Sequence, residues 1–181
     1  MTDVVEGIQA VGISGSPSPT SRSRILLGLA LAALERRGVV ATRTVDLAAL
    51  PADALLGRSR DTQVNDALAA VGRARILVVS TPVYRATYSG LLKVFFDLLP
   101  QDALAGKVAI AIATGGHAGH LLAIDTGLRP LLASVGALTV STAVYGTDAQ
   151  FQSGRPDSRL IDQLERAVAE ALALISTPVP A

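Results

Sequence analysis

The sequence contains no cysteine and no tryptophan, one methionine, and only 3% aromatic residues. Without cysteine, disulfides, thiolate catalysis and cysteine-ligated zinc are excluded. No run approaches the roughly 18 apolar residues that a membrane-spanning helix needs, so we expect no membrane contact. The first residues, 1–7, have neither a basic start nor a long apolar run, so we expect no secretory signal and a cytoplasmic location.

Charge is also scarce. Charged residues make up 17% of the 181 residues, half of the residues are hydrophobic, and the formal net charge is +1. Because nucleic-acid phosphates require a basic surface, we expect no nucleic-acid partner. So few charges predict that a second copy covers part of the apolar surface. The length predicts one domain over residues 1–181, with a frayed, proline-containing tail at 176–181.

Short apolar runs alternate along the chain with segments of helical periodicity. The runs that predict strands are 8–13, 39–45, 76–80, 108–113 and 138–145. The segments that predict helices are 22–37, 61–73, 89–99, 119–135 and 157–175. Several strands are apolar throughout, which is typical of parallel strands covered on both faces. The alternation therefore predicts an α/β fold with a five-stranded parallel sheet and helices on both faces.

Three residues predict details of these helices. Gly38 and Gly136 follow helical segments, at positions where a left-handed residue commonly ends a helix. Pro130 lies inside the segment 119–135 and has no amide hydrogen to donate, so it predicts a kink near Thr126.

Ligands of open parallel sheets bind beyond the carboxyl ends of the strands, where the strand order reverses. This rule selects three loops, which begin after the strands that end at Ile13, Ser80 and Ala113. The first loop, 14–23, carries hydroxyl groups on six of its ten residues and also contains Arg22. Hydroxyls, a guanidinium and the first amides of a helix all donate to phosphate oxygens. The loop lacks the glycine pattern of a dinucleotide site and the Gly-Lys-Ser/Thr of a Walker A loop, so it predicts a monophosphate site.

The second and third loops differ from the first in composition. Four of the six Phe and Tyr residues fall in the loop 81–90 and the helix after it, and Tyr84 and Tyr88 lie in the loop itself. Aromatic and apolar groups at a strand end suit a flat conjugated ring. The third loop, 114–117, has adjacent glycines, Gly115 and Gly116, which let the backbone approach a ligand and direct amides toward it.

The sequence gives little support to a metal site, a serine hydrolase or a simple electron carrier. His117 and His120 share a helical spacing, but only Asp125 is a nearby carboxylate, so we expect no metal site. Ser14 misses the Gly-x-Ser-x-Gly arrangement of a hydrolase nucleophile by one position. A simple electron carrier would need a strongly acidic docking surface, which a net charge of +1 does not provide.

Three groups of motifs follow one another in order. They are Gly-Ser-Pro at 15–17 with Ser-Arg-Ser at 21–23, Thr-Pro-Val-Tyr at 81–84 with Ser-Gly-Leu-Leu-Lys at 89–93, and Ala-Thr-Gly-Gly at 113–116 with His-Leu-Leu at 120–122. In this order they resemble the NADPH-dependent FMN reductase family, over about residues 8–145. The resemblance is strongest to its sulfonate-scavenging branch, which supplies reduced FMN to two-component alkanesulfonate monooxygenases.

The resemblance implies a flavodoxin-like fold with strand order 2-1-3-4-5, FMN as the cofactor, and NADPH or NADH as the reductant. It also implies a homodimer or homotetramer formed through the helix 89–99 and the region of Thr126, with a flavin-dependent monooxygenase as partner. No catalytic side chain is assigned. The residues predicted at the cofactor are Ser14, Ser16, Pro17, Thr20, Ser21, Arg22 and Ser23 at the phosphate, Pro82, Val83 and Tyr84 at the ring edge, and Thr114, Gly115, Gly116 and His117 at the pyrimidine end.

One position departs from the family pattern. Members of the sulfonate-scavenging branch tend to carry an inserted aromatic residue in the fourth helix, in a π-bulge at the tetramer interface that is linked to FMN release. Thr126 takes that place here and cannot stack, although Pro130 still favours a π-bulge nearby. Two functions therefore stay open: an FMN reductase that releases its flavin, and an FMN-bound NAD(P)H reductase of quinones, azo or nitro compounds, or chromate.

Overall fold

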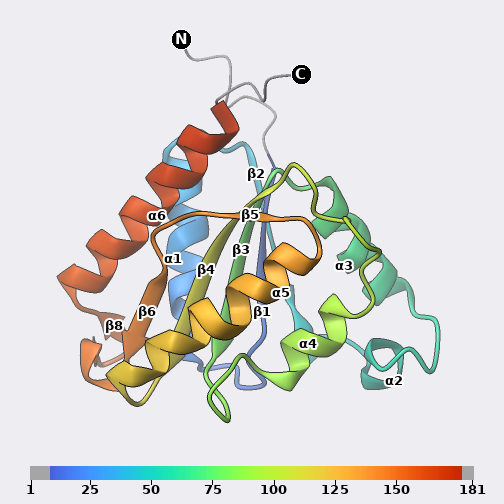
Figure 1. Cartoon of the computed structure of the whole chain (residues 1–181), viewed down its shortest axis with the longest axis horizontal. Coiled ribbons are helices and arrows are strands. Elements are labelled where there is room, and N and C mark those ends of the chain that lie inside the picture. Colours follow the sequence, from blue (N-terminus) through green and yellow to red (C-terminus); the bar gives the residue numbers. More distant parts are fainter. Residues whose placement is uncertain (1–8, 177–181) are drawn as a thin grey trace.

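The computed structural model describes residues 9–176. They form a central parallel sheet with helices packed around it (Figure 1). Its strands are β1 (Gln9–Ser14), β2 (Ala41–Asp46), β3 (Ile76–Pro82), β4 (Val108–Gly115), β5 (Leu138–Thr139) and β6 (Val144–Thr147). The order is β2-β1-β3-β4-β5, with β6 also paired to β4, and each of these pairs is parallel. The predicted α/β class and strand order are confirmed. Position 8 of the first predicted strand and positions 177–181 of the predicted tail lie outside the described residues.

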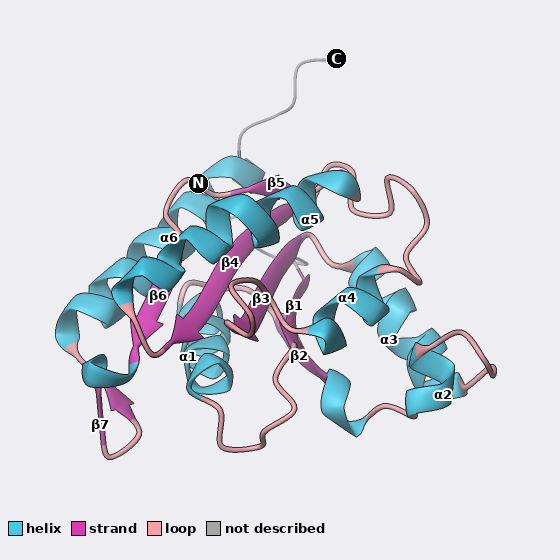
Figure 2. Cartoon of the chain, turned by 60° about the horizontal axis from the view of Figure 1, so that its bottom comes forward, coloured by secondary structure: helices cyan, strands magenta, loops and turns pink. Residues whose placement is uncertain are grey.

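Helices cover both faces of the sheet, as Figures 1 and 2 show. One face carries α1 (Arg22–Arg36) and α6 (Ser158–Ser176), and the other carries α3 (Thr62–Arg73), α4 (Gly90–Phe96) and α5 (Arg129–Ser134). Alternate residues of β3 serve the two cores: Ile76 belongs to the α1–α6 side and Leu77 to the other, and both are fully buried. This two-sided burial explains why the strand sequences read as apolar throughout.

The remaining elements are short. The described residues also form α2 (Ala52–Leu55), the antiparallel pair β7 (Phe151–Gln152) and β8 (Arg155–Pro156), and 3-10 turns at Leu47–Ala49, Ala118–Leu121 and Asp148–Gln150. None of the helices described is long and apolar enough to span a membrane.

The predicted single strand 138–145 is wrong, because it is divided into β5 and β6. Both pieces pair with β4, but the chain between them is held by side chains. Arg129 donates to the carbonyls of Val140 and Ser141, each at 2.7 Å. Glu170 of α6 accepts from the amide of Thr142 at 2.9 Å and from the hydroxyls of Ser141 and Thr142. These bonds occupy backbone groups that a continuous strand would direct to its neighbour.

The predicted helix 119–135 is also interrupted. It consists of the 3-10 turn Ala118–Leu121, a π-helical turn at Ile124–Leu128, and α5. The prediction of a distortion near Thr126 is confirmed, since Thr126 lies at the centre of the π-helical turn. Pro130 has no amide to donate to the carbonyl of Thr126, and the Thr126 hydroxyl donates to the carbonyl of Leu122 at 2.8 Å.

Both glycines predicted at helix ends have left-handed backbones. Gly38 follows α1 with a φ of 92° and Gly136 follows α5 with a φ of 88°. Gly136 is further restricted by space, because a Cβ atom there would lie 3.1 Å from the amide nitrogen of Ala105.

Candidate flavin site

The first loop is held in place by Gly15. Its amide donates to the carbonyl of Ser80 at the end of β3, at 2.8 Å. Its carbonyl accepts from the hydroxyl of Ser89, at 2.5 Å. A Cβ atom on Gly15 would lie 3.0 Å from Cβ of Leu92 and 3.2 Å from the Ser80 carbonyl oxygen. Glycine at this position therefore lets β1 and β3 and the start of α4 approach one another, which joins the first loop to the second.

The hydroxyls of the first loop lie near the start of α1. Ser18 and Thr20 have hydroxyl oxygens 3.3 Å apart, and those of Ser21 and Ser23 are 2.8 Å apart. Ser21 is the N-cap residue of α1, but its side chain makes no capping hydrogen bond. The first amides of α1 therefore have no side-chain cap and can donate to an anion, which the positive end of the helix dipole favours.

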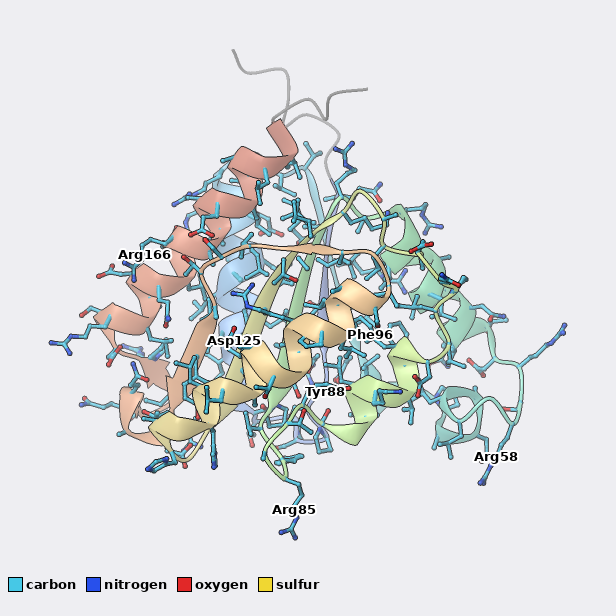
Figure 3. All side chains as sticks on the ribbon, in the orientation of Figure 1. Arg58, Arg85, Tyr88, Phe96, Asp125 and Arg166 are labelled. Atoms are coloured by element: carbon cyan, nitrogen blue, oxygen red, sulfur yellow. The ribbon has the colours of Figure 1, made fainter. Side chains whose placement is uncertain are left out.

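The second loop forms a tight turn. Tyr84 and Thr87 exchange two backbone hydrogen bonds, of 2.9 and 3.2 Å, around Arg85 and Ala86. Both central residues have positive φ, 50° for Arg85 and 67° for Ala86, which is costly for residues other than glycine. The turn leaves Tyr84 48% exposed, and Arg85 points away from the molecule in Figure 3. Val83, just before the turn, donates its amide to the carbonyl of Thr114, at 2.7 Å.

The third loop has a backbone that passes close to side chains. A Cβ atom on Gly115 would lie 2.7 Å from the hydroxyl oxygen of Tyr145 and 3.1 Å from Nδ1 of His120. The Tyr145 hydroxyl donates to the carbonyl of His117, at 2.7 Å. Burial, and to a smaller extent the Asp148 carboxylate, raises the pKa of Tyr145 above its usual range. The hydroxyl therefore stays protonated and keeps this loop in place.

The three loops meet at one cavity of about 640 Å³ at the carboxyl end of the sheet. It brings together ten of the fourteen residues predicted at the cofactor: Ser16, Thr20, Ser21, Arg22, Pro82, Val83, Tyr84, Thr114, Gly115 and Gly116. Hydroxyls and Arg22 lie at the start of α1, while Pro82, Val83 and Tyr84 supply an apolar wall. The cavity is therefore polar on one side and suited to a flat ring on the other.

Four of the predicted residues do not line this cavity. Ser14 is fully buried at the end of β1, and its hydroxyl has no hydrogen-bond partner in the described structure. Ser23 is buried and bonded to Ser21. Pro17 is exposed, and His117 is exposed with Nδ1 accepting from the amide of Gly119 at 3.0 Å.

Six residues that line the cavity are not among the fourteen predicted at the cofactor, although Ser18 belongs to the predicted first loop: Ser18, Ile25, Asp148, Phe151, Ser153 and Gly154. Four of them come from the connection between β6 and α6, where β7 and β8 form a hairpin. Its two turn residues, Ser153 and Gly154, have φ of 48° and 78°, the backbone of a two-residue type I′ turn. The Ser-Gly pair is a recognisable hairpin signal, but the rule that selects the loops at the switch in strand order does not point to this connection.

A second hollow, of about 600 Å³, lies on the outer surface of α1 and α6. It is lined by Arg37, Arg159, Asp162, Glu165 and Arg166, together with Ala169. It contains no residue from a strand end, and Glu165 already pairs with Arg37 at 2.7 Å. The cavity at the carboxyl end of the sheet is therefore the candidate site.

A family model of NADPH-dependent FMN reductases matches residues 8–152. The chain belongs to the NADPH-dependent FMN reductase family. This confirms the resemblance stated from the three motif groups. As a member of the family, the chain is an oxidoreductase whose cofactors are FMN and a nicotinamide nucleotide.

Individual members of this family are similar over most of the chain. An FMN reductase (NADPH) of Pseudomonas putida is 39% identical over 165 residues, which cover 90% of this chain and 83% of the relative. An NADH-dependent FMN reductase, SfnF, of Pseudomonas fluorescens is 34% identical over 169 residues, with 92% and 90% covered. The apo crystal structure of the NADH:FMN oxidoreductase EMOB matches with a TM-score of 0.86 and 39% identity, over 94% of this chain and 92% of that one. A flavodoxin of Streptococcus pneumoniae, at 16% identity and a TM-score of 0.61, shares the fold alone.

The residues of the cavity fit the FMN of this family. A monophosphate suits the hydroxyls, Arg22 and the uncapped amides at the start of α1. The buried hydroxyl of Ser14, which has no hydrogen-bond partner in residues 9–176, lies at the end of β1, directly before this loop. Gly115 and Gly116 leave the backbone at the end of β4 accessible, since both line the cavity without a side chain.

Proposed function

We propose that this chain reduces FMN with NADPH or NADH and releases the reduced FMN to a separate flavin-dependent monooxygenase. The observation that carries the proposal is the single cavity shared by the three strand-end loops. It combines a phosphate-binding start of a helix with an apolar wall and two accessible glycines. We also propose that the chain belongs to the sulfonate-scavenging branch of the family and that it is located in the cytoplasm.

The proposed roles follow the walls of the cavity. Ser16, Thr20, Ser21 and Arg22 hold the phosphate, together with the first amides of α1. The apolar wall of Pro82, Val83 and Tyr84 packs against the ring edge, and the backbone of Thr114, Gly115 and Gly116 meets the pyrimidine end. The four remaining predicted residues support these groups from behind or beside the cavity: Ser14, Pro17, Ser23 and His117.

The chemistry belongs to the cofactor, since FMN, when bound, accepts a hydride from a nicotinamide. The residues of the chain bind and orient the reactants. The backbone amides of the third loop can donate to negative charge at the pyrimidine end of the ring. Because hydride transfer requires no side-chain acid or base here, none is assigned.

A direct test is FMN titration followed by NADH and NADPH oxidation with FMN in excess. We expect saturable FMN binding, and nicotinamide oxidation that depends on both protein and FMN. No acceleration over a protein-free control would refute the proposal. Addition of a purified sulfonate monooxygenase tests the coupling, because the reductase is then expected to support substrate turnover without any other source of reduced flavin.

The alternative is a reductase that keeps FMN bound and reduces quinones, azo or nitro compounds, or chromate. The observation that favours it is Thr126, which takes the place of an aromatic residue that could stack. Thr126 is exposed, and its hydroxyl donates to the carbonyl of Leu122. Steady-state kinetics separate the two functions. Free FMN behaves as a varied substrate in the first, whereas an organic acceptor gives a two-substrate pattern with enzyme-bound FMN in the second.

A further inference from the structure

The charged side chains that line the cavity cancel each other. Of the residues that line it, Arg22 and Asp148 are the two with charged side chains. Nη1 of Arg22 donates to Oδ1 of Asp148, at 2.8 Å. A site that holds a phosphate tightly is expected to be positive, because the phosphate itself carries about −1.5 to −2 charges at neutral pH. The lining of this cavity instead contributes a formal charge of zero.

Asp148 is held by its neighbours beside the third loop. It follows Thr147, the last residue of β6, which is in register with Gly115 of β4. The amide of Thr147 donates to Oε1 of Gln150, at 3.0 Å, which fixes the turn that carries Asp148. The same connection supplies Phe151, whose ring centroid lies 5.8 Å from Cζ of Arg22. Arg22 therefore contacts two residues of the β6–α6 connection, while its side chain and that of Asp148 are 46% and 55% exposed.

We propose that Asp148 competes with the phosphate of FMN for Arg22 and so keeps the cofactor exchangeable. The proposal rests on the function proposed above, in which FMN enters and leaves as a substrate. Arg22 is the guanidinium available to the phosphate in this cavity, and Asp148 already accepts from it. A phosphate that bonds to Arg22 must displace this carboxylate or share the guanidinium with it. In both cases the phosphate gains less from Arg22 than it would from a guanidinium without a partner, which weakens phosphate binding.

The Asp148→Asn variant tests the proposal, because it removes the charge and keeps the shape of the side chain. We expect the Kd for FMN to fall about tenfold and the dissociation rate to fall with it, as measured by fluorescence titration and stopped flow. The affinity for riboflavin, which lacks the phosphate, is expected to stay unchanged. The matched control is Asp162→Asn, which removes the same charge from an exposed position on α6 outside the cavity. It should leave both affinities unchanged.

A double variant tests whether Asp148 acts through Arg22. In an Arg22→Gln background, Asp148→Asn should tighten FMN binding by much less than tenfold, because the guanidinium for which the two anions compete is gone. The full effect in that background would overturn the proposal. So would weaker or unchanged FMN binding in Asp148→Asn, or an equal gain for riboflavin.

The same measurements separate this proposal from the proposed function. If the wild-type chain binds FMN and turns it over with NAD(P)H while Asp148→Asn binds FMN with unchanged affinity, the competition is overturned and the function stands. If the wild-type chain binds no FMN, both fail.

Discussion

Arg22 is the one cationic side chain that the described structure places in the lining of the flavin cavity. We expect Arg22→Ala to raise the Kd for FMN about tenfold or more, since hydrogen bonds to a charged group contribute about 1.5–3 kcal/mol. The rate of hydride transfer at saturating FMN should change little, because the role proposed for Arg22 is to bind the phosphate, which is remote from the ring. Fluorescence titration and stopped-flow reduction measure the two quantities. Unchanged FMN affinity would contradict the role given to the first loop.

Gly115 and Gly116 provide a matched pair of positions for a second test. A Cβ atom on Gly115 would lie 2.7 Å from the Tyr145 hydroxyl, whereas on Gly116 the nearest atom, Oδ2 of Asp148, would be 3.9 Å away. We expect Gly115→Ala to displace Tyr145 from the His117 carbonyl and to lower the free energy of unfolding by about 1–3 kcal/mol. FMN binding should weaken as well. Gly116→Ala should unfold at the same urea concentration as the wild type. Equal destabilisation of both variants would show that the contact with Tyr145 does not determine the effect of Gly115→Ala.

Among the elements, one carboxylate of α6, that of Glu170, helps to hold the break between β5 and β6. Hydrogen bonds from Thr142, and then from Ser141, hold the pKa of Glu170 below its usual range. The ionised form therefore stabilises the fold. This contribution is complete above the pKa of an unfolded glutamate, about 4.3, and is lost as the pH falls through the lower pKa of the folded state.

Glu170→Gln is accordingly expected to lower the free energy of unfolding by about 1 kcal/mol at pH 7, because a neutral amide is a weaker acceptor for these donors. The difference from the wild type should shrink as the pH falls below about 4, where the wild-type carboxylate becomes protonated. Thermal unfolding of both proteins between pH 3 and 8 measures this. A difference that stays constant over that range would assign the effect to packing. Asp162→Asn, on the exposed side of the same helix, should follow the wild-type curve.

The sequence predicts an element well where its signal is local, and less well where the outcome depends on distant partners. The apolar runs of β1, β3 and β4 and the glycines at 38 and 136 determine their own backbone, so their predicted positions agree with the structure. The break between β5 and β6 requires Arg129 and Glu170, which approach it from two other elements. Asp148 enters the cavity for a similar reason, since only the pairing of β6 with β4 brings it beside Gly115. A local sequence pattern carries no information about contacts between residues that are far apart in the chain.

At the scale of the whole molecule, exposed apolar residues lie next to the π-helical turn. Leu121 is 41% exposed and Leu122 is 64% exposed. Because only 17% of the residues are charged, such exposed leucines favour a contact with a second copy. The neighbouring helix α4 buries Phe95 and Phe96 in the core, so its aromatic rings are not available to a partner. We therefore predict that these leucines supply exposed apolar surface to a contact between copies that is formed through the helix 89–99 and the region of Thr126.

We expect the wild-type chain to be a dimer or tetramer in solution and Leu122→Glu to shift it toward smaller species, because a charge buried between two copies is costly. Light scattering after size-exclusion chromatography measures the mass. Leu56→Glu is the matched control: Leu56 is 53% exposed directly after α2, which lies at the opposite end of the molecule from residues 118–128 in Figure 1. It should leave the mass unchanged. Equal masses for the wild type and Leu122→Glu would move the contact elsewhere, whereas a loss of mass in both variants would indicate that any added charge disrupts assembly.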